Sequence, residues 1–203
     1  MAIAAILLAA GESTRMGRLK QLLPWGGTTL IDWQVRQFVE AGVDSVIVVL
    51  GHAADDVQAA LPSTTRVTLN EDFRQGRASS LRRGAQAIDA PPDALLILSV
   101  DQPRPAWLSR RLIERWLLEK PLVVSPRFVD GFGHPVLLDG ALLPELRKVD
   151  EESLGLRAVI NRHLDTAAVE EVHNAQINVD LNTPADYEAA LASFDSGEWA
   201  GDE

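Results

Sequence analysis

The segment IAAILLAAGESTRMGRLKQLL, residues 3–23, decides the fold of this chain. Its first six residues, Ile3–Leu8, are all apolar, which predicts a strand buried on both faces of a sheet. Small residues follow that would let backbone N–H groups come close to a ligand: Ala9, Ala10 and Gly11. A buried strand that runs into such a loop is typical of open α/β sheets, in which ligands bind beyond the carboxyl ends of the strands.

Three cations gather in the same loop, although the formal net charge of the chain is −10. They are Arg15, Arg18 and Lys20. A guanidinium can bind phosphate oxygens in a bidentate way and an ammonium acts as a mobile point charge, so we expect Arg15 and Lys20 to hold an anionic ligand. For Arg18, a solvated turn is an equally good interpretation. The loop matches neither G-x-x-x-x-G-K-[ST] nor G-x-G-x-x-G, the two common phosphate-binding patterns.

The composition indicates an ordinary globular protein, because 46% of the 203 residues are hydrophobic and 24% are charged. We expect one domain over residues 1–195 and a disordered acidic tail over 196–203. The lack of cysteine excludes disulfides and thiolate zinc sites and suits a cytoplasmic protein. The acidic balance argues against nucleic-acid binding. No apolar run reaches the ~18 residues of a membrane span, and the apolar start lacks the basic region of a secretion signal.

Strands and helices alternate along the sequence. Apolar and β-branched runs predict strands over residues 3–8, 44–51, 66–69, 93–101, 122–125, 135–138 and 167–172. Amphipathic segments predict helices over residues 28–42, 54–61, 78–88, 106–119, 140–147, 153–162 and 184–192. This order predicts an α/β fold with a Rossmann-like, mostly parallel sheet and helices on both faces.

Two later segments place acidic residues where chemistry is expected. Asp101 directly follows an apolar strand and offers the hard oxygen ligands that Mg²⁺ prefers, and a helix N-cap before Pro103 is the less favoured alternative. In the second segment, Thr183 precedes Pro184, which predicts a helix N-cap and first helical residue. We therefore expect Thr183 and Asp186 to be structural residues.

The segment LAAGESTRMGRLKQLL, residues 8–23, resembles the first motif of the molybdenum cofactor cytidylyltransferases and related molybdopterin nucleotidyltransferases. Four further segments are similar to motifs of that family in the same order: NEDFRQGRASSLRRG (70–84), SVDQP (99–103), GHPVLL (133–138) and VDLNTPADY (179–187). One departure is Asn182, which stands where an Asp is commoner in the family. The resemblance spans almost the whole chain and implies an α/β fold of the nucleotide-diphospho-sugar transferase type.

The resemblance also implies a nucleotide-binding set, which consists of Ala9, Ala10, Gly11, Arg15, Lys20, Ser79, Ser80 and Asp101. Within it, Arg15, Lys20 and Asp101 are the implied catalytic residues. For the two serines, capping of a helix is an equally good interpretation.

Asp101 and Asp180 are implied as the ligands of Mg²⁺. Two carboxylates held close together without the ion should repel each other, so their removal should leave the melting temperature unchanged or slightly raised. His134 is implied as a contact of the acceptor substrate, and a purely structural histidine is an equally good interpretation.

The activity implied by the resemblance is Mg²⁺-dependent transfer of CMP from CTP to the phosphate of molybdopterin, with release of pyrophosphate. No nucleophile–base pair is apparent, so we expect direct transfer without a covalent intermediate. Guanylyl transfer, transfer to a sugar phosphate and a non-catalytic cofactor-binding chaperone stay open as alternatives. We expect a monomer, in transient contact with a molybdoenzyme or its maturation factor.

Overall fold

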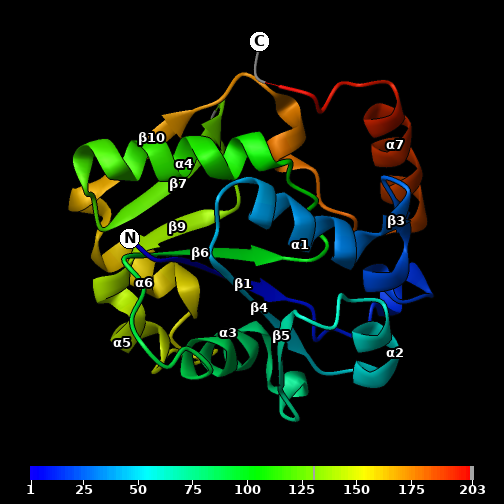
Figure 1. Cartoon of the computed structure of the whole chain (residues 1–203), viewed down its shortest axis with the longest axis horizontal. Coiled ribbons are helices and arrows are strands. Elements are labelled where there is room, and N and C mark those ends of the chain that lie inside the picture. The colour runs from blue at the N-terminus through cyan, green and yellow to red at the C-terminus, as the bar shows by residue number, and fades with distance from the viewer. Residues whose placement is uncertain (130, 202–203) are drawn as a thin grey trace.

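The computed structural model describes residues 1–129 and 131–201 and has a single large sheet at its centre (Figure 1). The strand order is β10-β7-β9-β6-β1-β4-β5, and β8 pairs with Arg127 and Phe128 at the end of β7. The strands are β1 (Ile3–Leu8), β4 (Ser45–Leu50), β5 (Arg66–Leu69), β6 (Ala94–Ser99), β7 (Val123–Phe128), β8 (Gly131–Phe132), β9 (Val136–Asp139) and β10 (Ala167–Glu171). Only β9 and the two-residue β8 run against the other strands of this sheet in the described part of the chain, so the predicted mostly parallel sheet is confirmed.

Helices cover both faces of the sheet, as predicted. One face carries α1 and α4, and the other carries α3, α5 and α6 (Figure 1). The helices are α1 (Leu30–Glu40), α2 (Ala54–Ala59), α3 (Arg77–Gln86), α4 (Ala106–Glu119), α5 (Leu143–Leu146), α6 (Leu156–Arg162) and α7 (Pro184–Asp195). Short 3-10 turns follow β1 and precede α3, and a hairpin of β2 (Pro24–Trp25) and β3 (Thr28–Thr29) leads into α1. None of the helices in the described ranges is long and apolar enough to cross a membrane.

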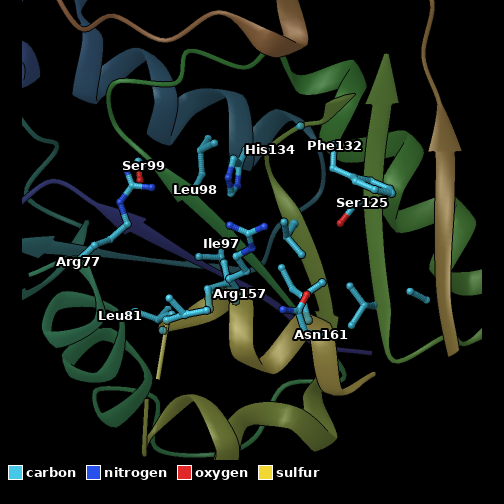
Figure 2. Close-up of a pocket in the computed structure, with 18 of the residues that line it drawn as sticks. Arg77, Leu81, Ile97, Leu98, Ser99, Ser125, Phe132, His134, Arg157 and Asn161 are labelled. Atoms are coloured by element: carbon cyan, nitrogen blue, oxygen red, sulfur yellow. The ribbon is translucent and has the colours of Figure 1, made fainter. Parts of the chain in front are cut away.

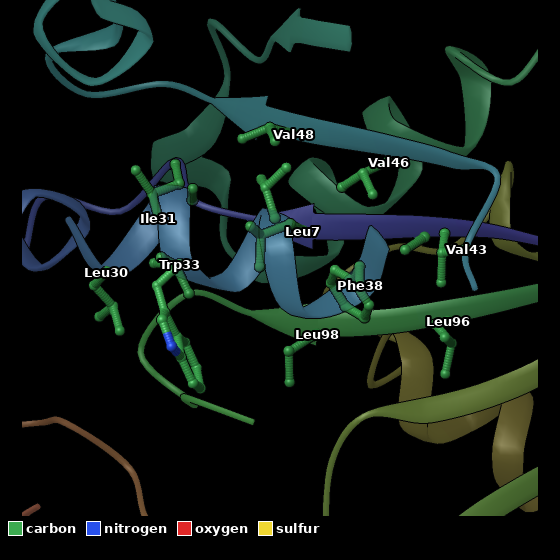
Figure 3. Packing of buried hydrophobic residues seen from close by; sticks show 14 of the residues in the cluster. Leu7, Leu30, Ile31, Trp33, Phe38, Val43, Val46, Val48, Leu96 and Leu98 are labelled. Carbon is green, nitrogen blue, oxygen red and sulfur yellow. The ribbon is translucent and has the colours of Figure 1, made fainter. Parts of the chain in front are cut away.

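All residues of β1 are apolar because its side chains pack into two hydrophobic cores, one on each face of the sheet. Ala5 and Leu7 point into the core under α1 and α4, whereas Ile6 and Leu8 point into the core under α3. Figure 3 shows Leu7 packed among side chains of α1, β4 and β6 in the first core. Because Leu7 is fully buried, truncation to Ala would cost about 2–5 kcal/mol of folding free energy. The pairing of β1 with both β4 and β6 fixes it at the centre of the sheet.

Local signals set the ends of the helices. The Thr29 side chain accepts a hydrogen bond from the backbone N–H of Asp32 and caps α1. At α7, Thr183 and Asp186 form a reciprocal capping box and Pro184 occupies the first turn, which confirms the structural role predicted for them. This cap also fixes the segment just before it, which carries Asp180 and Asn182 to the edge of the sheet.

The structure differs from the predicted disordered tail at Trp199. This side chain is buried and lies against Trp25, with ring centroids 5.4 Å apart, and against Phe194 at 5.9 Å. The backbone carbonyl of Trp199 also accepts a hydrogen bond from the Trp107 indole. One large aromatic side chain therefore anchors an otherwise acidic segment, an effect that a composition argument cannot detect. Residues 202–203 of the predicted tail lie outside the described residues.

Candidate active site

The loop after β1 wraps around a small cavity of about 240 Å³ at the carboxyl edge of the sheet. Ala9, Ala10 and Gly11 line it, as expected from the sequence. The neighbouring backbone must come close here, because a Cβ at Gly51 would lie 2.8 Å from the Cβ of Ala10. The Gln21 amide holds the loop by donating to the carbonyls of Ala9, at 2.7 Å, and Gly11, at 3.1 Å.

Lys20 and Asp101 form an ion pair at this cavity, with 3.1 Å between Nζ and Oδ2. The sequence separates them by 81 positions, and the adjacency of β1 and β6 brings them together. The Lys20 ammonium also lies 3.5 Å from Oδ1 of Asn182. Lys20 is buried, so this cation is fixed by oxygen partners and is not a flexible surface lysine.

The other two cations of the loop have different surroundings. Arg15 donates to Oδ1 of Asn182 at 2.8 Å, so the segment before α7 links it to Lys20. Arg18 lies over the Tyr187 ring, 5.3 Å from its centroid, and neither Arg15 nor Arg18 is among the residues that line the small cavity. For Arg18, the exposed position on the Tyr187 ring favours the solvated turn over a ligand contact.

Asp180 lies next to Asp101 through the backbone, because the N–H of Leu181 donates to the Asp101 carbonyl at 2.8 Å. Its carboxylate accepts from the Gln102 amide at 3.0 Å and is 3.8 Å from the Arg104 guanidinium. Each carboxylate therefore has its own cation, Lys20 for Asp101 and Arg104 for Asp180. This corrects the expectation of two mutually repelling carboxylates, because that expectation ignored the cations that the fold supplies.

Arg104 is a buried cation that the sequence analysis missed. Burial lowers its pKa to about 10, while Asp180 and Asp101 act in the opposite direction, so Arg104 stays charged at neutral pH. Its guanidinium donates to the carbonyls of Pro103, Val179 and His134. Gln34 fixes the same turn by accepting from the Arg104 N–H and donating to the Gln102 carbonyl. The sequence signal that could have indicated this residue is its position between two prolines in DQPRP, residues 101–105.

The oxygen-bearing side chains at the carboxyl edge of the sheet fit a divalent cation such as Mg²⁺. Asp101, Asp180 and Asn182 offer hard oxygen atoms on two adjacent segments, and the Lys20 ammonium already bonds to oxygens of Asp101 and Asn182. No group of three or more acidic, histidine or cysteine side chains forms a metal cage within residues 1–129 and 131–201. Mg²⁺ commonly binds through one or two carboxylates, substrate phosphates and water, which matches this sparse donor set.

The two serines at the start of α3 are held by Asn70. Its amide donates to the hydroxyls of Ser79, at 2.9 Å, and Ser80, at 3.0 Å. The Ser79 hydroxyl lies within hydrogen-bond distance of the backbone carbonyls of Asp72 and Gly76 and does not line the cavity. It does not cap α3, whose N-cap residue is Gly76. Ser80 does line the cavity.

His134 lines a second, larger cavity of about 840 Å³ beside the first (Figure 2). This cavity lies between the sheet and α6, and most of its lining is apolar, from β6, β7, β9, β10 and α6. Burial lowers the pKa of His134 to about 4, helped by the positive charges of Arg104 and Arg77, so the imidazole is neutral at physiological pH. Its Nδ1 is buried and has no hydrogen-bond partner in the described structure.

The two cavities adjoin, since Leu8, Arg77 and Ser99 line both. The arrangement provides a small polar site with paired cations and carboxylates, next to a large apolar site with a neutral histidine. A sequence model for the MobA-like NTP transferase domain matches residues 5–167. The chain belongs to the MobA-like NTP transferase family.

Two relatives are similar to this chain over most of its length. Molybdenum cofactor cytidylyltransferase of Escherichia coli (strain K12) is 25% identical over 196 residues, which cover 95% of this chain and 97% of the relative. Nicotine blue oxidoreductase of Paenarthrobacter nicotinovorans is 31% identical over 172 residues, or 79% of this chain and 82% of the relative.

The chain also resembles solved structures. Rv0371c from Mycobacterium tuberculosis H37Rv superimposes with a TM-score of 0.81 at 30% identity, over 95% of this chain and 98% of that one. A second structure of Rv0371c, in complex with manganese, gives a TM-score of 0.77 at 29% identity, over 95% of this chain and 100% of that one. Together with the family match and the similarity to a nucleotidyl transferase from Methanothermobacter thermautotroptrophicus, with a TM-score of 0.82 at 27% identity over 97% of this chain and 99% of that one, these structures confirm the nucleotidyltransferase type of α/β fold expected from the sequence.

Proposed function

We propose that this chain is a divalent-metal-dependent cytidylyltransferase that joins CMP from CTP to the phosphate of molybdopterin. The proposal rests on family membership and on the similarity to the Escherichia coli molybdenum cofactor cytidylyltransferase over nearly the whole of both chains. Its single strongest structural support is the adjacency of a small polar cavity and a large apolar cavity, with the Lys20–Asp101 pair at the smaller one.

The reaction forms one P–O bond and breaks another. An oxygen of the acceptor phosphate attacks the α-phosphorus of CTP, and the bond from that phosphorus to the oxygen bridging to the β-phosphate breaks. Pyrophosphate leaves with the electron pair. No covalent intermediate on the protein is required, so the protein acts by positioning the two anions and neutralising their charge.

Residues that line the small cavity or lie beside it would divide this work. Backbone N–H groups of Ala10 and Gly11 would face the triphosphate, with Lys20 and Arg15 providing positive charge at its oxygens. Asp101 and Asp180 would hold Mg²⁺, an ion that offsets negative charge on the phosphates and the leaving pyrophosphate when bound. The manganese complex of Rv0371c supports a divalent ion for relatives of this chain.

The larger cavity favours molybdopterin over a sugar phosphate as acceptor. Leu, Ile and Val are the largest group of side chains in its lining, and the ring system of a pterin can pack against them. Polar side chains are the minority of this lining, and each sugar hydroxyl buried there without a partner would cost about 1–3 kcal/mol. The neutral imidazole of His134, with its unpaired Nδ1, offers a hydrogen-bonding group to the heteroatoms of such a ring.

The test offers the purified protein molybdopterin, Mg²⁺ and each of the four nucleoside triphosphates, and follows pyrophosphate. We expect release with CTP. Release with GTP alone would show that the enzyme transfers GMP instead of CMP. Release only when glucose 1-phosphate or another sugar phosphate is supplied would show that the acceptor is a sugar phosphate instead of molybdopterin. A folded protein that binds CTP and releases no pyrophosphate with any acceptor would favour the cofactor-binding chaperone. The predictions of a monomer and of transient contact with a molybdoenzyme are tested by light scattering and pull-down with such an enzyme.

A further inference from the structure

Arg77 is the charged residue at the junction of the two cavities. Of the three residues that line both, Leu8 is apolar and Ser99 is neutral. In Figure 2 the Arg77 side chain extends toward Ser99 at the carboxyl end of β6. Arg77 is therefore the charged side chain that both cavities share.

Two arginines of this site differ from the other arginines of the chain. The side chains of Arg77 and Arg157 make no ion pair, hydrogen bond or ring contact with any residue in the described ranges, whereas each of the others makes at least one. Both line the larger cavity, one from the start of α3 and the other from α6. Both side chains are exposed, and two cations without an ion-pair partner at one cavity of an acidic chain fit an anionic ligand.

The backbone around Arg77 is fixed while its side chain is not. Gly76 has φ 111°, and a Cβ there would lie 2.5 Å from the Glu151 carboxyl carbon. Glu151 in turn accepts from the Ala78 N–H at 2.8 Å, and the Ser79 hydroxyl donates to the Gly76 carbonyl. The residues on both sides of Arg77 are thus held in place, and the guanidinium keeps all its donors for a ligand.

The charges inside the larger cavity leave an excess of one positive unit. Arg77 and Arg157 are positive, Glu151 is negative and His134 is neutral at pH 7. Glu151 lies beyond ion-pair distance of both arginines, and it uses one oxygen on the α3 backbone. A phosphate monoester that enters this cavity therefore meets guanidinium groups that no carboxylate occupies.

We propose that Arg77, with Arg157 as the second cation, binds the phosphate of the acceptor and holds it toward the α-phosphate of the donor. The proposal rests on the function proposed above and adds the residues that select the acceptor class, a phosphate monoester carried on an apolar ring system. Bidentate contacts from a planar guanidinium would orient the attacking oxygen, which a single ammonium cannot do.

A binding experiment tests this without turnover. The probe is 4-methylumbelliferyl phosphate, an apolar ring with a phosphate monoester, and its dephosphorylated form is the uncharged comparison. Calorimetry should give tighter binding of the phosphate form to the wild type, and about a tenfold or greater weakening in Arg77→Gln and in Arg157→Gln. Arg83→Gln is the matched control on α3, since Arg83 is exposed and lies outside both cavities. Arg77→Lys should restore only part of the affinity.

Three results would overturn the proposal. The first is equal affinity for the charged and uncharged probes. The second is unchanged probe binding in Arg77→Gln, with thermal melting used to verify that the variant is folded. The third is loss of probe binding on saturation with CTP, which would place the probe in the donor cavity.

Kinetics separate this proposal from the proposed function. With CTP and molybdopterin, Arg77→Gln should raise the KM for the acceptor at least tenfold and leave the KM for CTP within about twofold. A normal acceptor KM with active enzyme would refute the role of Arg77 and leave the cytidylyltransferase intact. Arg77-dependent probe binding in a protein that transfers no nucleotide would refute the proposed activity and support the anion site.

Discussion

The ion pair between Lys20 and Asp101 should contribute measurably to stability, and Asp101→Asn tests this. At 3.1 Å and an effective dielectric constant of ~20, the Coulomb attraction is about 5 kcal/mol before the cost of desolvation. The Lys20 side chain is only 10% exposed, so Asp101→Asn leaves a nearly buried ammonium without its counter-ion. Since Asp101 is 21% exposed, we expect a loss of about 2–3 kcal/mol, below the ~3–5 kcal/mol typical when a fully buried pair is broken.

Urea and thermal unfolding of the metal-free, nucleotide-free protein measure this loss. The melting temperature should fall by about 4–12 °C, given ~2–4 °C per kcal/mol for a chain of this size. Glu12→Gln is the control, because it breaks the exposed pair with Arg74 and should cost less than ~1 kcal/mol. In a double-mutant cycle with Lys20→Met, the two losses should not add. An Asp101→Asn protein as stable as the wild type would refute the reasoning and restore the picture of two repelling carboxylates.

Four further predictions concern single residues. Lys20→Ala should lower nucleotidyl transfer at least ~10²-fold, and Lys20→Arg should not restore it fully; steady-state pyrophosphate release measures both. Asp180→Asn should weaken binding of Mn²⁺ in the presence of CTP, followed by electron paramagnetic resonance, and wild-type Mn²⁺ affinity would remove Asp180 from the metal site. The pKa of His134 lies at about 4 in the folded chain, below its ordinary 6.5. The contribution of the neutral imidazole to stability is therefore complete above pH 6.5 and is lost as the pH falls toward 4. The free energy of unfolding between pH 7 and 4 should be less pH-dependent in His134→Gln, where the charges that face the site, those of Arg104, Arg77, Asp180 and Asp101, are unchanged. Trp199→Ala should cost about 3–5 kcal/mol in urea unfolding, because it removes a buried ring from the contact with Trp25, whereas an unchanged midpoint would restore the disordered tail.

The sequence predicts the sheet well because its signal is local. Each residue of Ile3–Leu8 is buried, one set of alternate side chains in each core, so a continuous apolar run is the pattern that such a central strand requires. The helix start at Thr183 is equally local, since the capping box needs only four consecutive residues. The Trp199 anchor is not local, because its burial depends on Trp25 and Phe194 elsewhere in the chain.

The charges of the site could be predicted in type but not in pairing. The motifs single out Lys20 and Asp101, yet their ion pair depends on β6 lying beside β1, which composition and spacing do not specify. Arg104 is harder still: a buried arginine is rare, and its burial is possible only because three backbone carbonyls and Asp180 surround the guanidinium. Sequence patterns record which residues are present, whereas the partners of a buried charge come from the topology.

The distribution of these partners explains why an acidic chain gathers cations at one edge of its sheet. On the donor side, the charge of Lys20 is balanced by Asp101, whereas Arg15 donates to the uncharged amide of Asn182, so one positive charge is left there and both cations have fixed partners without a ligand. On the acceptor side, Arg77 and Arg157 keep their donors free within the described structure. Positive charge is thus local to the places where phosphates are proposed to bind, and the remaining surface can be acidic without repelling the substrates at contact, because charges beyond ~10 Å are largely screened by salt.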